Sequence, residues 1–72
     1  MKRTYYEAVV KLKEPVRGIH TYRYNGCQKV RYKMKGDNAK LWFYHPNGTV
    51  VTEEFSNVLS VEVRKYKRKD KR

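Results

Sequence analysis

Apolar and polar residues alternate with a period of two in segment after segment of this chain, and no segment keeps a helical period. Between residues 4 and 13, Tyr6, Ala8, Val10 and Leu12 occupy every second position and would share one face of a strand. Pro15 cannot donate to a strand ladder, which predicts that this first strand ends before it. The same alternation predicts further strands over residues 19–24, 27–34, 39–45, 49–55 and 58–64.

Turn-forming residues separate these segments. Asn25-Gly26 is the dipeptide best suited to a two-residue hairpin, because both central positions of a type I′ turn need a positive φ. Further turns are predicted at residues 36–38, 45–48 and 56–57, where Gly, Asp, Asn, Pro and Ser gather. We therefore expect an all-β fold, a small antiparallel meander of about five or six strands. Because so small a sheet must cover its apolar face, we expect a curled sheet or a partly open barrel.

The length of 72 residues allows one domain, because two halves would each bury too little apolar surface to fold. We place that domain at residues 1–63. Residues 64–72, RKYKRKDKR, combine seven Lys and Arg with the single acid Asp70, so we expect a basic, disordered tail. The formal net charge of the chain is +11, which indicates a polyanion as the leading partner, with plain solubility as the alternative.

The spacing of the His, Glu and Cys residues does not favour a catalytic or metal site. His20 and His45 lack Cys or His neighbours at zinc-ligand spacing, and the adjacent Glu53 and Glu54 would point to opposite faces of a strand. Cys27 is the only cysteine, which excludes an intramolecular disulfide and favours the cytoplasm. No signal peptide or membrane-spanning apolar run is evident. We therefore expect no enzyme activity, cofactor, metal, small-molecule substrate or membrane attachment.

A two-residue hairpin at Asn25-Gly26 would fix which side chains share a face. Counting outward would pair Tyr24 with Cys27 and Tyr22 with Lys29, so that rings and cations gather on one face. Such a face suits nucleic acid, DNA or RNA, because cations neutralise phosphates and rings stack on unpaired bases. The predicted nucleic-acid-binding residues are Tyr22, Tyr24, Lys29, Arg31 and Lys33, with Arg64, Lys65, Lys67 and Arg68 from the tail. Alternatively, the two tyrosines pack against the stems of Lys29 and Arg31 and bind nothing.

The segment at residues 39–45 supports a different hypothesis. Its alternation would separate two sets of side chains: Ala39, Leu41 and Phe43 on one face, and Lys40, Trp42 and Tyr44 on the other. If they are exposed, Trp42, Tyr44 and Val50 would form a protein interface. The protein would then be a small protein-binding regulator or inhibitor of a larger enzyme that is acidic or handles nucleic acid. If it is buried, Trp42 would anchor the core instead. An assembly subunit, joined through an open strand edge, is a third hypothesis.

Overall fold

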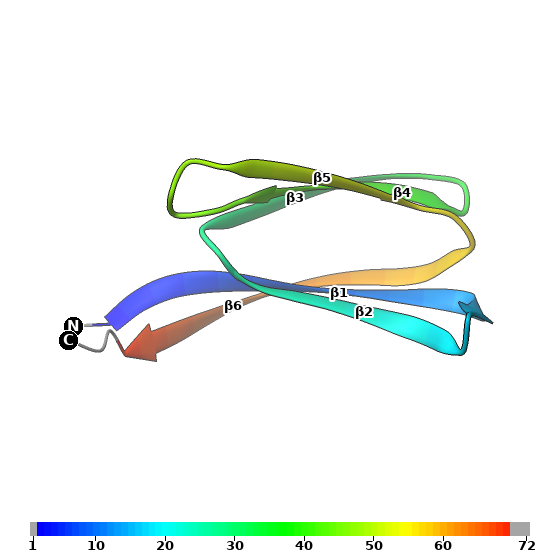
Figure 1. Ribbon diagram of the computed structural model, residues 1–72, viewed down its shortest axis with the longest axis horizontal. Coiled ribbons are helices and arrows are strands. Elements are labelled where there is room, and N and C mark those ends of the chain that lie inside the picture. The colour runs from blue at the N-terminus through cyan, green and yellow to red at the C-terminus, as the bar shows by residue number, and fades with distance from the viewer. Residues whose placement is uncertain (1, 70–72) are drawn as a thin grey trace.

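The computed structural model describes residues 2–69, which form six antiparallel strands and no helix. The strands make two three-stranded sheets, ordered β2-β1-β6 and β3-β4-β5, that lie over one another as two layers (Figure 1). Their bounds are β1 Lys2–Val16, β2 Ile19–Cys27, β3 Lys29–Lys35, β4 Asn38–Tyr44, β5 Val50–Phe55 and β6 Val58–Lys69. The prediction of an all-β fold of antiparallel strands is confirmed, and the two sheets do not close into a barrel.

Strand β1 is the centre of its sheet and is longer than the sequence indicated. It continues through Pro15 to a two-residue turn at Arg17-Gly18, where φ is 54° and 80°. The pairing with β6 ends at Leu12, and the pairing with β2 is irregular between Lys11 and Val16. Pro15 therefore lies where the ladders require no N–H donor, which explains why it does not end the strand.

The predicted hairpin at Asn25-Gly26 is wrong. Both residues belong to β2, which pairs with β1, and the chain then passes through Gln28 into β3 of the other sheet. Along β2, Tyr24 pairs with Ala8 and the next registered residue, Cys27, pairs with Tyr6, so Asn25 and Gly26 together oppose one residue of β1. Gly26 has a φ of 74°. The positive φ thus serves a β-bulge at the corner between the sheets, not a turn between paired strands.

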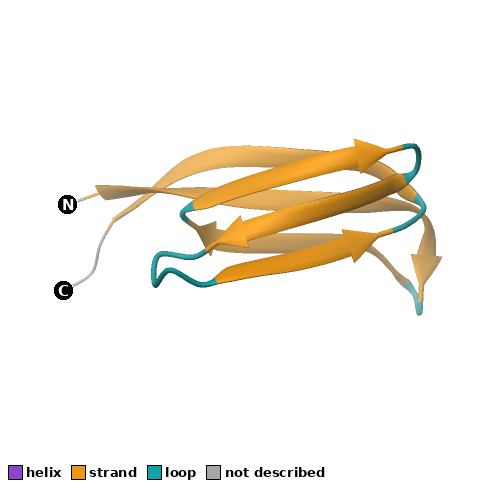
Figure 2. Ribbon diagram, turned by 90° about the horizontal axis from the view of Figure 1, so that it is seen from above, coloured by secondary structure: helices purple, strands orange, loops and turns teal. Residues whose placement is uncertain are grey.

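The second sheet is a meander of β3, β4 and β5 with turns at both ends (Figure 2). Gly36-Asp37 connects β3 to β4 as a two-residue turn between the paired residues Lys35 and Asn38. The turn between β4 and β5 is closed by a hydrogen bond of 2.9 Å from the His45 N–H to the Thr49 carbonyl. Ser56-Asn57 leads from β5 back to the first sheet, so this predicted turn joins the layers and not two neighbouring strands.

The core lies between the two sheets. Its buried side chains come mainly from the two central strands, as the alternation predicted: Ala8, Val10 and Leu12 of β1, Ala39, Leu41 and Phe43 of β4, with Cys27 and Val58. Because successive side chains of a strand point to opposite faces, the alternate residues of β1 and β4 lie on the outer sides of the two sheets, where Val9 of β1 is nevertheless buried at 1% exposure. In this way the core determines the composition of both outer surfaces.

Residues 64–69 are not a disordered tail. They extend β6, which stays paired with β1 from Leu12–Val58 to Lys2–Lys69. The extension is anchored by Tyr66, whose ring centroid lies 6.0 Å from that of Tyr5. The N-terminal half of β1 offers a free ladder edge here, and pairing with it outweighs the repulsion expected of a basic segment. Residues 70–72 of the predicted tail lie outside the described residues.

Among residues 2–69, no helix with the length and apolar character of a membrane span is found.

Candidate functional site

The surface of the β3-β4-β5 sheet that points away from the core combines aromatic and cationic side chains. Since Ala39, Leu41 and Phe43 point into the core, their neighbours along β4 point outward. We define the outer face by the outward residues of the three strands: Lys29, Arg31, Lys33 and Lys35 of β3, Lys40, Trp42 and Tyr44 of β4, and Val50, Thr52 and Glu54 of β5. The aromatic residues are therefore in the middle of the sheet.

The register of the outer face places a cation beside each ring. Lys29 pairs with Tyr44 and Arg31 pairs with Trp42 across β3 and β4. On the other side of β4, Tyr44 pairs with Val50 and Trp42 pairs with Thr52. Residues directly opposite in an antiparallel pair have neighbouring side chains on one face. Trp42 and Tyr44 thus form a partly exposed aromatic centre with positive charge along its β3 side.

Two lysines contact the aromatic rings directly. The ammonium of Lys29 lies 5.7 Å from the centroid of the Tyr44 ring, and that of Lys40 lies 5.4 Å from the Trp42 ring. Such cation–π contacts hold the ammonium groups beside the rings at a small energetic gain when the site is exposed. Lys40 also lies 4.0 Å from the Glu54 carboxylate, an exposed ion pair that adds little stability. The lysines therefore remain accessible to an anionic partner.

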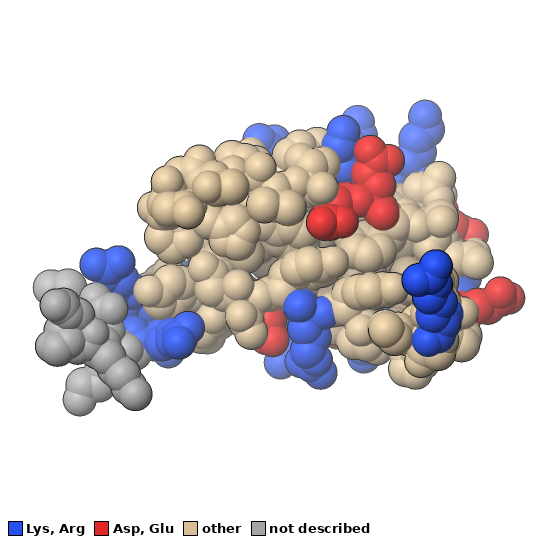
Figure 3. Space-filling model, in the orientation of Figure 1, with Lys and Arg blue, Asp and Glu red and all other residues tan. Residues whose placement is uncertain are grey.

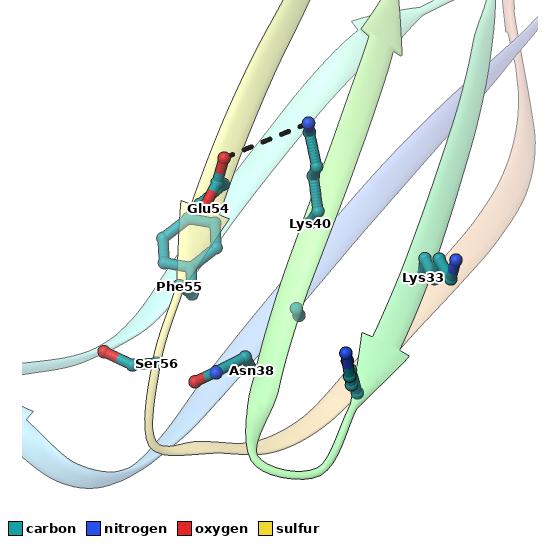
Figure 4. A pocket seen from close by; sticks show the side chains of 8 residues that line it. Lys33, Asn38, Lys40, Glu54, Phe55 and Ser56 are labelled. Carbon is teal, nitrogen blue, oxygen red and sulfur yellow. Dashed lines mark ion pairs between the residues drawn. The ribbon is translucent and has the colours of Figure 1, made fainter.

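A shallow hollow of about 420 Å³ lies at the end of the outer face that is nearest the Gly36-Asp37 turn. It is lined by Lys33 of β3, Lys40 of β4 and Glu54 of β5, with Asn38 and Ser56 near the adjoining strand ends (Figure 4). In the space-filling view, lysine and arginine side chains project from the top of the upper sheet, while its acidic side chains gather on the side (Figure 3). The hollow is open and cationic, which suits a phosphate group.

The structure separates Tyr22 and Tyr24 from the cations with which the sequence grouped them. Both tyrosines point into the core, where the Tyr22 ring centroid lies 5.2 Å from that of Phe55 and the Tyr24 ring centroid lies 4.5 Å from that of Phe43. Burial raises the pKa of Tyr24, and the nearby charge of Glu53 and the Tyr22 hydroxyl raise it further. The predicted grouping is wrong because it depended on pairing between β2 and β3, which lie in different sheets.

The other predicted residues are brought together in a new combination. Lys29, Arg31 and Lys33 do share one exposed face, but their aromatic neighbours are Trp42 and Tyr44. Val50, which is 49% exposed, extends the same surface on β5. The predicted protein interface and three of the predicted cations are thus one surface. The Gly36-Asp37 turn carried the signal for this arrangement, since a two-residue turn there pairs Lys33 with Lys40 and fixes the rest of the register.

The cations of β6 lie on the other sheet. Arg64 and Arg68 point to the outside of the β2-β1-β6 sheet, where Arg64 contacts Glu62 at 3.5 Å and Arg68 lies 6.0 Å from the Tyr5 ring. Lys65 and Lys67 occupy the alternate positions and point to the opposite side of β6. These four residues therefore form no single surface with the outer face defined above.

The reactive side chains within the part of the chain that the structure describes include His20 on the surface and Cys27 in the core. No group of three His, Cys, Asp or Glu side chains from residues 2–69 converges as metal ligands would. His20 contacts the Thr21 hydroxyl at 3.2 Å on the exposed surface. Cys27 is buried, and burial raises the pKa of its thiol, which opposes formation of the nucleophilic thiolate.

Comparisons with known proteins give no relative for this chain: no protein-family model, no curated protein and no solved structure matches it. Its function is therefore inferred from the geometry and chemistry of its own surfaces.

Proposed function

We propose that the protein is a non-enzymatic nucleic-acid-binding module whose outer face takes single-stranded nucleic acid. The observation that carries the proposal is the placement of Trp42 and Tyr44 in the central strand of a sheet, with Lys29 and Arg31 directly opposite them. A flat sheet that presents aromatic rings between cations can stack unpaired bases on the rings and hold their phosphates at its margin.

The charges of the outer face support a nucleic acid as the bound partner. Its five cations, Lys29, Arg31, Lys33, Lys35 and Lys40, stand against one carboxylate, that of Glu54. Lys33 and Lys40 pair across β3 and β4 at the cationic hollow, two residues along each strand from the Arg31–Trp42 pair. A strand of nucleic acid that stacks on Trp42 could therefore extend a phosphate into this hollow. Neutralisation of phosphates by these side chains would release counterions and strengthen binding at low salt.

Trp42 is the only tryptophan, so its fluorescence reports directly on the proposed site. Titration with single-stranded DNA or RNA should quench this fluorescence as bases stack on the indole ring. If Lys29, Arg31 and Lys33 each contact one phosphate, the slope of log K against log salt concentration should be about −2. An affinity that does not change with salt, or an absence of binding at about 50 mM salt, would contradict the proposal.

A protein-binding regulator is the second candidate function, and Val50 favours it. This side chain is 49% exposed beside Tyr44 and extends the apolar surface around Trp42 and Tyr44, residue types that are enriched at binding hot spots. The expected partner is an acidic protein, because the surrounding charge is positive. Recovery of one stoichiometric acidic partner that persists after nuclease treatment would favour this function over the first. The cytoplasm is the compartment we propose for either function.

A further inference from the structure

One end of the β2-β1-β6 sheet narrows to a two-stranded ribbon. The last registered pair between β1 and β2 is Tyr6 with Cys27, whereas β1 and β6 continue to Lys2 with Lys69. Residues 2–5 and 66–69 are therefore paired with each other and have no third strand beside them. We call these eight residues the ribbon; they lie at one end of the two-layered body (Figure 1).

The ribbon carries charge of one sign on both of its faces. Residues 2–5 and 66–69 read KRTY and YKRK, which is five Lys or Arg residues and no acid. The register places Arg3 opposite Arg68, on the face that Tyr5 and Tyr66 share, and Lys67 opposite Thr4 on the other face. Because this end of the sheet carries only positive charge in its sequence, a partner of opposite charge is favoured.

Tyr66 fixes the direction of the ribbon relative to the body. Its hydroxyl accepts a hydrogen bond of 3.0 Å from the backbone N–H of Gly26, at the end of β2. Its ring also packs against Tyr5, and the Arg68 guanidinium lies over the Tyr5 ring at 6.0 Å. The base of the ribbon is thus held on two sides, and its cations are presented on a structured element. Preorganisation of this kind lowers the entropic cost of binding.

We propose that the ribbon is a second nucleic-acid contact, which enters the major groove of duplex DNA. Two paired strands lie about 5 Å apart, and the major groove of B-form DNA, about 12 Å wide, admits a two-stranded ribbon. Cations on both faces of the ribbon then reach the phosphates on both walls of the groove. A-form RNA has a deep and narrow major groove, which excludes such an element. This inference shares with the proposed function the assumption that the partner is nucleic acid, and it does not depend on the outer face.

The test compares two charge-matched variants on three probes. The ribbon variant carries Lys67→Gln and Arg68→Gln, which leaves the Tyr66 anchor intact. The control carries Lys11→Gln and Lys13→Gln, two exposed positions on β1 beyond the ribbon. Fluorescence anisotropy measures the affinity of each protein for a DNA duplex of about 16 base pairs, an RNA duplex of the same sequence and single-stranded DNA. Far-ultraviolet circular dichroism and urea midpoints verify that each variant is folded.

The ribbon variant should lose about tenfold or more in affinity for duplex DNA, and at most about threefold for duplex RNA and single-stranded DNA. The control should lose at most about threefold on every probe. Equal losses by the ribbon variant on both duplexes, or equal losses by the ribbon and control variants on duplex DNA, would overturn the inference. So would an absence of duplex DNA binding by the unmodified protein.

The same measurements separate this inference from the proposed function. If the unmodified protein does not bind single strands but its affinity for duplex DNA depends on the ribbon, the outer face is not a single-strand site and the ribbon inference stands. If single strands bind through Trp42 and the ribbon variant loses no selectivity for duplex DNA, the proposed function stands and the ribbon inference is wrong.

Discussion

The hydroxyl of Tyr66 accepts a hydrogen bond from the backbone N–H of Gly26, which joins β6 to the corner where the chain leaves the first sheet for the second. The site is partly buried, so the Gly26 N–H would have poor access to water without this acceptor. We expect Tyr66→Phe to lower the free energy of unfolding by about 1–2 kcal/mol, the cost of an unsatisfied partly buried donor. Urea denaturation measures this loss.

Tyr5→Phe is the matched control, because it keeps the ring packed against Tyr66 and leaves the Tyr66–Gly26 hydrogen bond in place. It should change the free energy of unfolding by less than about 0.5 kcal/mol. Equal effects of the two substitutions would show that the hydrogen bond does not secure the corner.

The turn between β1 and β2 offers a stabilising substitution. Arg17 and Gly18 both have positive φ, as a type I′ turn requires, but an arginine side chain disfavours this conformation. Arg17→Asn would supply the preferred first residue of such a turn and should raise the free energy of unfolding by about 0.5–1 kcal/mol. A rise in the urea midpoint at constant m-value would show this. Arg17→Val, which is branched at Cβ, should lower the midpoint at the same position.

The tyrosines of the core and the aromatic residues of the outer face should respond oppositely in binding and stability measurements. Trp42→Ala should weaken binding to single-stranded DNA by about 1–3 kcal/mol, the contribution of one stacked base. Tyr24→Leu should change that affinity less than about twofold but lower the urea midpoint, because Tyr24 packs against Phe43 in the core. Anisotropy with a labelled oligonucleotide measures both affinities.

Tyr32 provides the control for loss of an exposed ring. It is 47% exposed on β3, and it pairs with Leu41 on the side of the sheet that faces the core. Tyr32→Ala should therefore leave the affinity for single strands unchanged within about twofold. If Tyr32→Ala weakened binding as much as Trp42→Ala, the outer face would not be the specific binding site for single-stranded nucleic acid.

The stability of the fold should decline at alkaline pH. Burial raises the pKa of Cys27, and burial with the charge of Glu53 raises the pKa of Tyr24, so both groups hold their protons more strongly in the folded state than in the unfolded state. The unfolded chain then binds fewer protons, and the free energy of unfolding falls as the pH rises. The decline should begin near about pH 9, where an exposed thiol loses its proton, and continue past about pH 10 through Tyr24.

Urea denaturation at a series of pH values, under reducing conditions, measures the decline. Cys27→Ala removes the thiol, so its stability should change less than that of the unmodified protein between about pH 8 and pH 10, even if its stability at neutral pH is lower. Identical pH profiles for the two proteins would assign the alkaline effect to other groups.

The alternation of side chains predicted the core well, because burial on one side of a strand recurs at every second residue. Val10 and Leu12 of β1, and Leu41 and Phe43 of β4, are buried as the pattern indicated. The extent of β1 and β6 could not be predicted in the same way. Their ends pair with each other across nearly the whole described chain, and no local pattern in a basic segment reports such a distant partner.

The sequence grouped Tyr22 and Tyr24 with the cations of β3 because Asn25-Gly26 is compatible with two different backbone structures. A glycine with positive φ serves a hairpin turn and a β-bulge equally well, and Gly26 serves the bulge. The true hairpin at Arg17-Gly18 has a weak signal, since arginine rarely adopts positive φ. Trp42 could not be assigned to the core or the surface from its own strand. That assignment needs the second sheet layer, which covers the Leu41 side and leaves the Trp42 side open.

The position of β1 between β2 and β6 also has a kinetic consequence. Strands β3, β4 and β5 are neighbours in sequence and need only two short turns, whereas the β1–β6 ladder must bring together Arg3 and Arg68 from opposite ends of the described chain. Closing a long loop costs more entropy than closing a short one, and such contacts slow folding. The sheet with Trp42 should thus form early in refolding, and amide protection along β6 should appear last, when β1 gains its second partner.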